Sequence, residues 1–94
     1  MVRHIVSWKL RDDVRAEAAP IIKRRLEGLV GQIPQLISMH VGQVFGAGEY
    51  DLALYSEFAT RGDLQIYNDH PLHRAVSEYI STVRVSRMML DFED

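Results

Sequence analysis

The amino-acid sequence predicts an α+β fold in which a four-stranded antiparallel sheet carries helices on one face. Three observations support this prediction. Strand-like and helix-like segments follow one another in the order β-α-β-β-α-β, with the second helix broken at residues 69–71. A short glycine-containing turn joins the two central strands. A chain of 94 residues leaves room for a single domain, residues 1–94. This order is that of the ferredoxin-like split βαβ arrangement.

The first element is predicted to be a strand over residues 2–10. Side chains alternate in character along this segment, so that His4 and Trp8 share the more apolar face and Arg3 and Lys9 lie on the other. His4 is therefore expected to point toward the core.

A helix is expected to follow, beginning near Ala16 or Glu17 and ending at Pro34. With that start, Pro20 lies close to the first turn, where a missing amide is tolerated. Pro34 ends the helix because a proline disfavours the α conformation of the residue before it. The apolar residues of this segment recur three or four positions apart: Val14, Ala18, Ile22, Leu26, Leu29 and Ile33.

Two further strands are expected over residues 36–45 and 51–58, paired as an antiparallel hairpin through the turn at residues 46–49. In the first of them, alternation places three apolar residues on one face: Ile37, Met39 and Val41.

The remaining residues predict two helices and a last strand. Thr60 and Asp63 have the spacing of a capping box, which begins a short helix from about residue 61 to residue 68. Pro71 breaks this helix and begins a second one. Strand character returns over residues 83–92.

Composition excludes several classes of function. Eleven basic and thirteen acidic residues give a net charge of −2, which argues against binding to nucleic acid or to an anionic membrane surface. The absence of cysteine excludes disulfides and thiolate chemistry. No apolar segment approaches the roughly 20 residues that span a bilayer, and no signal peptide is visible. We therefore expect a cytoplasmic protein.

The sheet face opposite the helices also needs cover. Ile5, either Leu52 or Ala53, and part of the segment 85–92 would otherwise contact water. A homodimer in which two sheets pack face to face would bury them.

The densest cluster of reactive side chains is the run Tyr67-x-x-His70-Pro71-x-His73. This run resembles the signature of the stress-responsive α/β-barrel (Dabb) family, and the resemblance covers essentially the whole chain. It implies a dimeric α+β barrel with the helices outside. Other features that match are His4, Ile33-Pro34, Tyr50-Asp51, Phe58 and Asp91-Phe92.

The resemblance also implies two kinds of function. The family includes plant polyketide cyclases of the olivetolic acid cyclase type, which close a ring by aldol condensation without a metal or an organic cofactor. Their catalytic tyrosine and histidine correspond to Tyr67 and His73, and a further pocket histidine corresponds to His4. Other members are stress proteins with no known reaction, so a non-catalytic structural oligomer is the alternative. A monooxygenase-like activity is a more distant third possibility.

The residue types suit proton transfer. A neutral histidine such as His73 can remove a proton next to a carbonyl group, and a tyrosine such as Tyr67 can donate a hydrogen bond to the oxyanion that forms. The sequence therefore predicts a small-molecule-binding protein, with a cyclase or isomerase acting on a small apolar or β-dicarbonyl ligand as the enzymatic interpretation. His4 would position the substrate or stabilise the oxyanion.

The pocket wall is predicted to include Trp8, Leu26, His70 and Tyr79. If these side chains fill the pocket, the structural alternative is favoured. For His70, whose backbone before a proline is extended, a structural hydrogen bond is the simpler interpretation. A zinc site built on His70 and His73 is disfavoured, because the proline between them breaks helical spacing. No metal or cofactor is expected.

Overall fold

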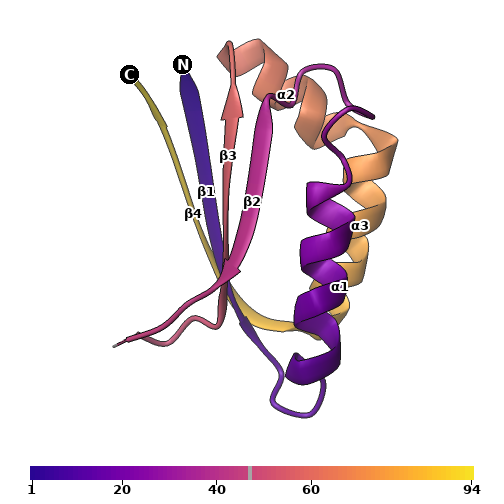
Figure 1. The fold of residues 1–94 in the computed structure, drawn as a ribbon, viewed down its shortest axis with the longest axis vertical. Helices are drawn as coiled ribbons and strands as arrows, with labels where there is room; N and C mark the ends of the chain where they lie inside the picture. The colour runs from indigo at the N-terminus through magenta and orange to yellow at the C-terminus, as the bar shows by residue number, and fades with distance from the viewer. Residues whose placement is uncertain (47) are drawn as a thin grey trace.

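The computed structural model describes residues 1–46 and 48–94, which form one antiparallel sheet and a helical layer on one of its faces (Figure 1). The sheet order is β2-β3-β1-β4, and every neighbouring pair of strands is antiparallel. The ferredoxin-like fold predicted from the sequence is confirmed. The elements are β1 (Val2–Leu10), α1 (Arg15–Glu27), β2 (Ser38–Gln43), β3 (Leu52–Phe58), α2 (Arg61–Asp69), α3 (Pro71–Val83) and β4 (Arg84–Glu93).

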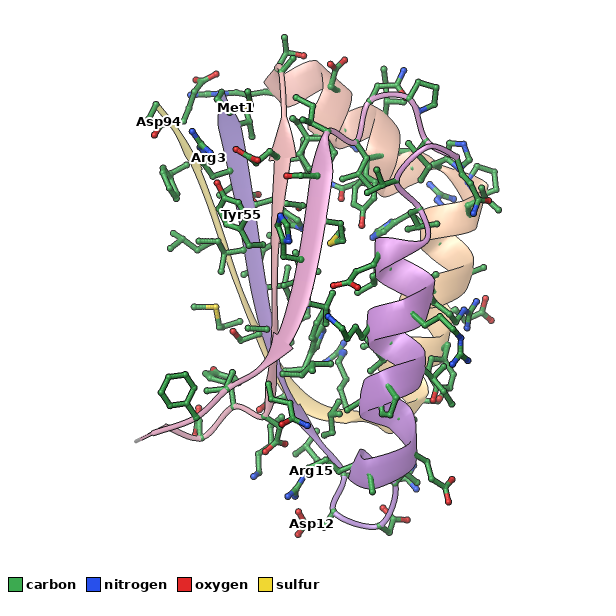
Figure 2. The ribbon with its side chains drawn as sticks, in the orientation of Figure 1. Met1, Arg3, Asp12, Arg15, Tyr55 and Asp94 are labelled. Carbon is green, nitrogen blue, oxygen red and sulfur yellow. The ribbon has the colours of Figure 1, made fainter. Side chains whose placement is uncertain are left out.

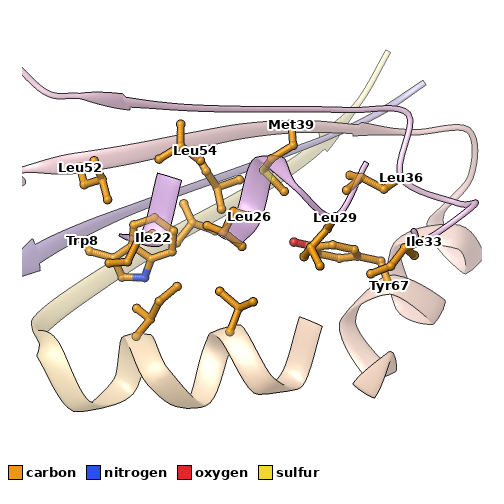
Figure 3. Close-up of a cluster of buried hydrophobic side chains, with 14 of the residues drawn as sticks. Trp8, Ile22, Leu26, Leu29, Ile33, Leu36, Met39, Leu52, Leu54 and Tyr67 are labelled. Atoms are coloured by element: carbon orange, nitrogen blue, oxygen red, sulfur yellow. The ribbon is translucent and has the colours of Figure 1, made fainter. Parts of the chain in front are cut away.

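Strand β1 lies at the centre of the sheet, and every second side chain along it is buried against the helices. Strand β3 alternates in the same way, so the two strands present matched apolar faces to α1 and α3. His4 is buried on this face, as the alternation predicts. Figure 3 shows the apolar cluster that fills the space between the layers. The largest fully buried hydrophobic side chains are Tyr67, Phe58, Leu10, Ile22, Leu26 and Ile33.

Helix α1 is shorter than the sequence predicts, because it ends at Glu27 rather than at Pro34. Gly31 has a φ of 89°, which a continuing helix does not allow. Leu29 and Ile33 are nevertheless buried, so the apolar spacing that predicted the longer helix reflects core packing after the helix has ended. The prediction for Pro20 is also wrong. The helix begins at Arg15, so this proline lies beyond the first turn and removes one internal hydrogen bond.

The junction between α2 and α3 follows the predicted signals. The hydroxyl of Thr60 accepts a hydrogen bond from the Asp63 amide at 3.0 Å and caps α2. Pro71 is the first residue of α3. His70 Nδ1 accepts the Leu72 amide at 3.1 Å, which makes this histidine the N-cap of α3. The structural interpretation of His70 agrees with this geometry.

The face of the sheet opposite the helices has no cover within the described chain. Along β2, Met39 and Val41 face the helices, whereas Ile37 precedes the strand and is exposed, contrary to its predicted place beside them. Leu52 also faces the helices, so Ala53 is the β3 residue of the open face. The exposed apolar side chains of β4 on this face are Met88, Leu90 and Phe92.

The same open face has a polar part around Arg3 and Tyr55, which Figure 2 shows on the side of the sheet away from the helices. Arg3 Nη1 donates to the Tyr55 hydroxyl at 2.5 Å and also pairs with Glu57. His40 stacks on Tyr55, with 6.4 Å between ring centroids.

No helix among the described residues is long and apolar enough to cross a bilayer.

Candidate functional site

A cavity of about 120 Å³ lies between the sheet and α3. It contains two of the predicted catalytic residues, His4 and His73, and two of the predicted wall residues, Trp8 and Leu26. Apolar side chains therefore leave a small open space around the histidines. The lining residues are His4, Val6, Trp8, Leu26, Leu54, Asn68, His73, Ser77, Ile80, Ser81, Arg84 and Arg87.

His73 is held in one orientation by the end of α2. Its Nδ1 lies 3.0 Å from the backbone carbonyl oxygen of Asn68. A carbonyl oxygen only accepts hydrogen bonds, so Nδ1 carries a proton and Nε2 of the neutral ring keeps its lone pair. Burial lowers the pKa of His73, the bond to Asn68 opposes this change, and the charges of His4, Arg87 and Arg74 lower the pKa further. The neutral imidazole is thus favoured, which is the form that accepts a proton.

His4 is tied to the last strand. His4 and Asp91 are directly opposite each other in the β1–β4 pairing, and both side chains extend to the helix side of the sheet. His4 Nδ1 is hydrogen-bonded to the carboxylate of Asp91. A carboxylate on Nδ1 fixes the ring and leaves Nε2 for another partner. His4 is 4 % exposed, so it is part of the inner wall.

Tyr67 lies beside His73 and not on the cavity wall. The two rings are 4.3 Å apart between centroids, and Phe58 packs on the other side of Tyr67 at 5.1 Å. The Tyr67 hydroxyl is buried without a hydrogen-bond partner among the described residues, and Figure 3 shows it within the apolar cluster. Burial raises the pKa of Tyr67, so the hydroxyl stays protonated. A buried hydroxyl without a partner is rare in native proteins.

Two predicted wall residues lie elsewhere. His70 caps α3, as described above, and Tyr79 packs under the guanidinium of Arg25, whose Cζ lies 5.5 Å from the ring centroid. Among the described residues, no cluster of His, Asp and Glu could hold a metal ion. The cavity lining also includes three residues that were not predicted for the site: Asn68, Arg84 and Arg87. For Asn68 the sequence contains one signal, its place within the motif that begins at Tyr67. Its contribution is a backbone carbonyl, which every residue carries, so its residue type gave no indication.

The lowered pKa of His73 has a consequence for stability. The unfolded chain, in which histidine titrates near its ordinary value of about 6.5, binds a proton more readily than the folded chain. The contribution of neutral His73 to the free energy of unfolding is therefore fully present above about pH 6.5. It is lost as the pH falls from there toward the lower pKa of the folded protein. We expect the melting temperature of the wild type to fall more steeply than that of His73→Gln over this range, as measured by circular dichroism. Parallel curves would contradict the lowered pKa.

The sheet with its single helical layer and cavity defines a ferredoxin-like α+β protein. The chain belongs to the Stress responsive A/B Barrel Domain family, whose model matches residues 2–94. No curated protein matches the sequence.

Solved structures agree with this assignment. A dimeric protein of unknown function and ferredoxin-like fold from Bacteroides fragilis is 35 % identical, with a TM-score of 0.85 and coverage of 99 % of this chain and 95 % of that one. A dimeric ferredoxin-like protein of unknown function from Thermobifida fusca is 28 % identical, with a TM-score of 0.87 and coverage of 99 % and 90 %. A hydroxynitrile lyase from Passiflora edulis is 18 % identical, with a TM-score of 0.87 and coverage of 97 % and 90 %, and shares the fold.

Proposed function

We propose that this protein is a cofactor-independent acid–base enzyme, a lyase, isomerase or cyclase, that acts on a small carbonyl compound. The observation that carries the proposal is the state of His73: a neutral imidazole that lines a cavity, with Nδ1 occupied by a backbone carbonyl and Nε2 able to accept a proton. A positioned general base of this kind accelerates proton transfer by about 10²–10⁴-fold.

The residues around the cavity suggest how such a reaction proceeds. His73 Nε2 removes a proton from the carbon next to the carbonyl group, and the carbonyl oxygen takes up the negative charge. The bond from Nδ1–H to Asn68 stabilises the imidazolium that forms. His4, fixed by Asp91, lies on the same wall and would position the substrate. The Tyr67 hydroxyl is a protonated donor beside His73, and its side chain would have to move out of the apolar cluster to reach the oxyanion.

The cavity volume limits the substrate. A cavity of 150 Å³ binds benzene, and pockets for drug-sized ligands measure roughly 300–1,000 Å³. At about 120 Å³, this cavity holds a compound no larger than benzene or the reacting end of a longer one. This size favours a small carbonyl substrate over a polyketide whose whole acyl chain is enclosed.

The proposal is tested by hydrogen–deuterium exchange at the methyl group of pyruvate, followed by ¹H NMR in D₂O. Pyruvate has as many non-hydrogen atoms as benzene and carries exchangeable protons next to its ketone. The wild type is expected to exchange these protons faster than buffer alone. An exchange rate equal to that of buffer, with folded protein, would contradict the proposal.

Replacing Tyr67 by Phe separates catalysis from stability. The hydroxyl has no partner among the described residues, so its removal is expected to leave the free energy of unfolding unchanged or to raise it by up to about 1–3 kcal/mol. If the hydroxyl donates to the oxyanion, the exchange rate should fall by about tenfold or more. Urea unfolding and the exchange assay check both outcomes. Lower stability together with unchanged exchange would assign Tyr67 to packing alone.

We further propose that the protein is a homodimer whose two open sheet faces pack together. The relatives from Bacteroides fragilis and Thermobifida fusca are dimeric. The exposed apolar side chains of β4 would be buried by such packing, and the cavity lies on the opposite side of the sheet. The alternative function, a non-catalytic stress-response oligomer, uses the same dimer and assigns His73 only to joining α2 and α3.

A further inference from the structure

The rim of the cavity carries unbalanced positive charge. Arg84 and Arg87 both line it, and no Asp or Glu of the described residues does, although the carboxylate of Asp91 is hydrogen-bonded to the lining residue His4. Arg87 is opposite Trp8 in the β1–β4 pairing, which places its side chain on the helix side of β4. Arg84 is the C-cap of α3 and the first residue of β4.

Neither arginine has an ion-pair partner in the described part of the chain. The one hydrogen bond of the Arg87 side chain there goes to Met89 Sδ at 3.3 Å, a weak acceptor. Two other exposed arginines are paired, Arg74 with Asp69 at 3.4 Å and Arg61 with Glu93 at 3.0 Å, whereas Arg24 on α1 also has no ion pair among the described residues. Unpaired guanidinium groups at a concave site concentrate a positive potential there.

We propose that the cavity takes a small carbonyl compound that carries a carboxylate, with the carboxylate at Arg84 and Arg87 and the carbonyl end inside near His73. This inference rests on the proposed function and names its substrate class, an oxo acid. A guanidinium group matches a carboxylate with two parallel hydrogen bonds. The apolar inner wall of Val6, Trp8 and Leu54 suits the carbon end of the molecule.

The bound carboxylate would also assist the base. In the free protein, Arg87 is one of the charges that disfavour protonation of His73. An anion between the guanidinium groups offsets their charge, so it stabilises the imidazolium that forms during proton removal. Substrate binding would in this way make the base stronger at the moment when it is used.

The test compares the binding of pyruvate with that of pyruvamide, which has the same size and no charge. Dissociation constants are measured by NMR titration of the protein. Wild type is expected to bind pyruvate at least about tenfold more tightly, since hydrogen bonds to charged groups contribute about 1.5–3 kcal/mol. Arg87→Gln should remove most of this preference and leave pyruvamide binding unchanged.

The matched control is Arg74→Gln, which removes the same charge from α3 at a residue outside the cavity. It should keep the preference for pyruvate. Equal binding of pyruvate and pyruvamide to the wild type would overturn the inference, as would equal losses in the Arg74 and Arg87 variants. Inorganic phosphate that binds as tightly as pyruvate would overturn the assignment to a carboxylate.

These experiments distinguish a failure of the proposed anion site from a failure of the proposed catalytic role of His73. Selective binding of pyruvate without catalysed exchange would support the anion site and contradict the role of His73. Catalysed exchange that is equally fast with pyruvamide would support His73 and contradict the anion site.

Discussion

Replacing His73 by Gln is expected to slow the exchange of pyruvate methyl protons by about 10²–10⁴-fold, because the variant lacks the imidazole Nε2 that accepts the proton. The glutamine amide can still donate to the Asn68 carbonyl, so the contact between α2 and α3 is retained. The measurement is the exchange rate by ¹H NMR, with circular dichroism to show that the variant is folded.

The control for His73→Gln is His70→Asn. This change removes an imidazole three residues away, outside the cavity, and asparagine preserves the N-cap of α3. His70→Asn should exchange at the rate of the wild type. A wild-type rate in His73→Gln would contradict the catalytic role and favour the structural alternative. In that case, His73→Ala should still lower stability by about 1–3 kcal/mol through its lost buried hydrogen bond.

Replacing Leu90 by Asp is expected to convert the dimer into a monomer. Leu90 is 50 % exposed on the open sheet face, opposite Ile5 in the β1–β4 pairing. In the proposed dimer its side chain is buried, and an unpaired carboxylate there costs several kcal/mol in each of two symmetric positions. The dissociation constant should rise by about 10²-fold or more, measured by sedimentation velocity over a range of concentrations.

The neighbouring residue provides the matched control. Met89 is 53 % exposed on the same strand, and its side chain lies on the helix side of the sheet because it is opposite Val6. Met89→Asp therefore introduces the same charge at the same exposure on the face that the dimer leaves free. It should remain dimeric. A monomer in both variants would indicate a general destabilisation of β4, and a dimer in both would contradict face-to-face packing.

Local signals in the sequence predicted most of the fold, because the elements depend on patterns that are local. Alternation along residues 2–10 identified β1 and the inward direction of His4. The hydroxyl of Thr60 and the ring of Pro71 marked the starts of α2 and α3. The end of α1 was predicted wrongly, since Leu29 and Ile33 continue a helical spacing that the backbone abandons. Both side chains are buried by tertiary packing. The spacing of apolar residues alone does not distinguish such packing from a helix that continues.

The candidate site was predicted only in part, for a related reason. The motif singled out His73 and Tyr67. Strand alternation predicted the inward direction of His4, and the family resemblance made it a candidate. The partners that define their chemistry depend on non-local geometry. Asp91 meets His4 through the register of β1 and β4, and a carbonyl of α2 orients His73 across the proline break. Arg87 reaches the cavity by the same strand pairing.

The proposed function depends on the protonation state of His73, which ¹⁵N NMR of the imidazole nitrogens measures. At about pH 7, in the protein without ligand, we predict a neutral ring with Nδ1 protonated and Nε2 unprotonated. We also predict that the Nε2 resonance moves when pyruvate binds. An imidazolium at this pH, or a neutral ring with its proton on Nε2, would contradict the proposed function, because neither form has a base available in the cavity.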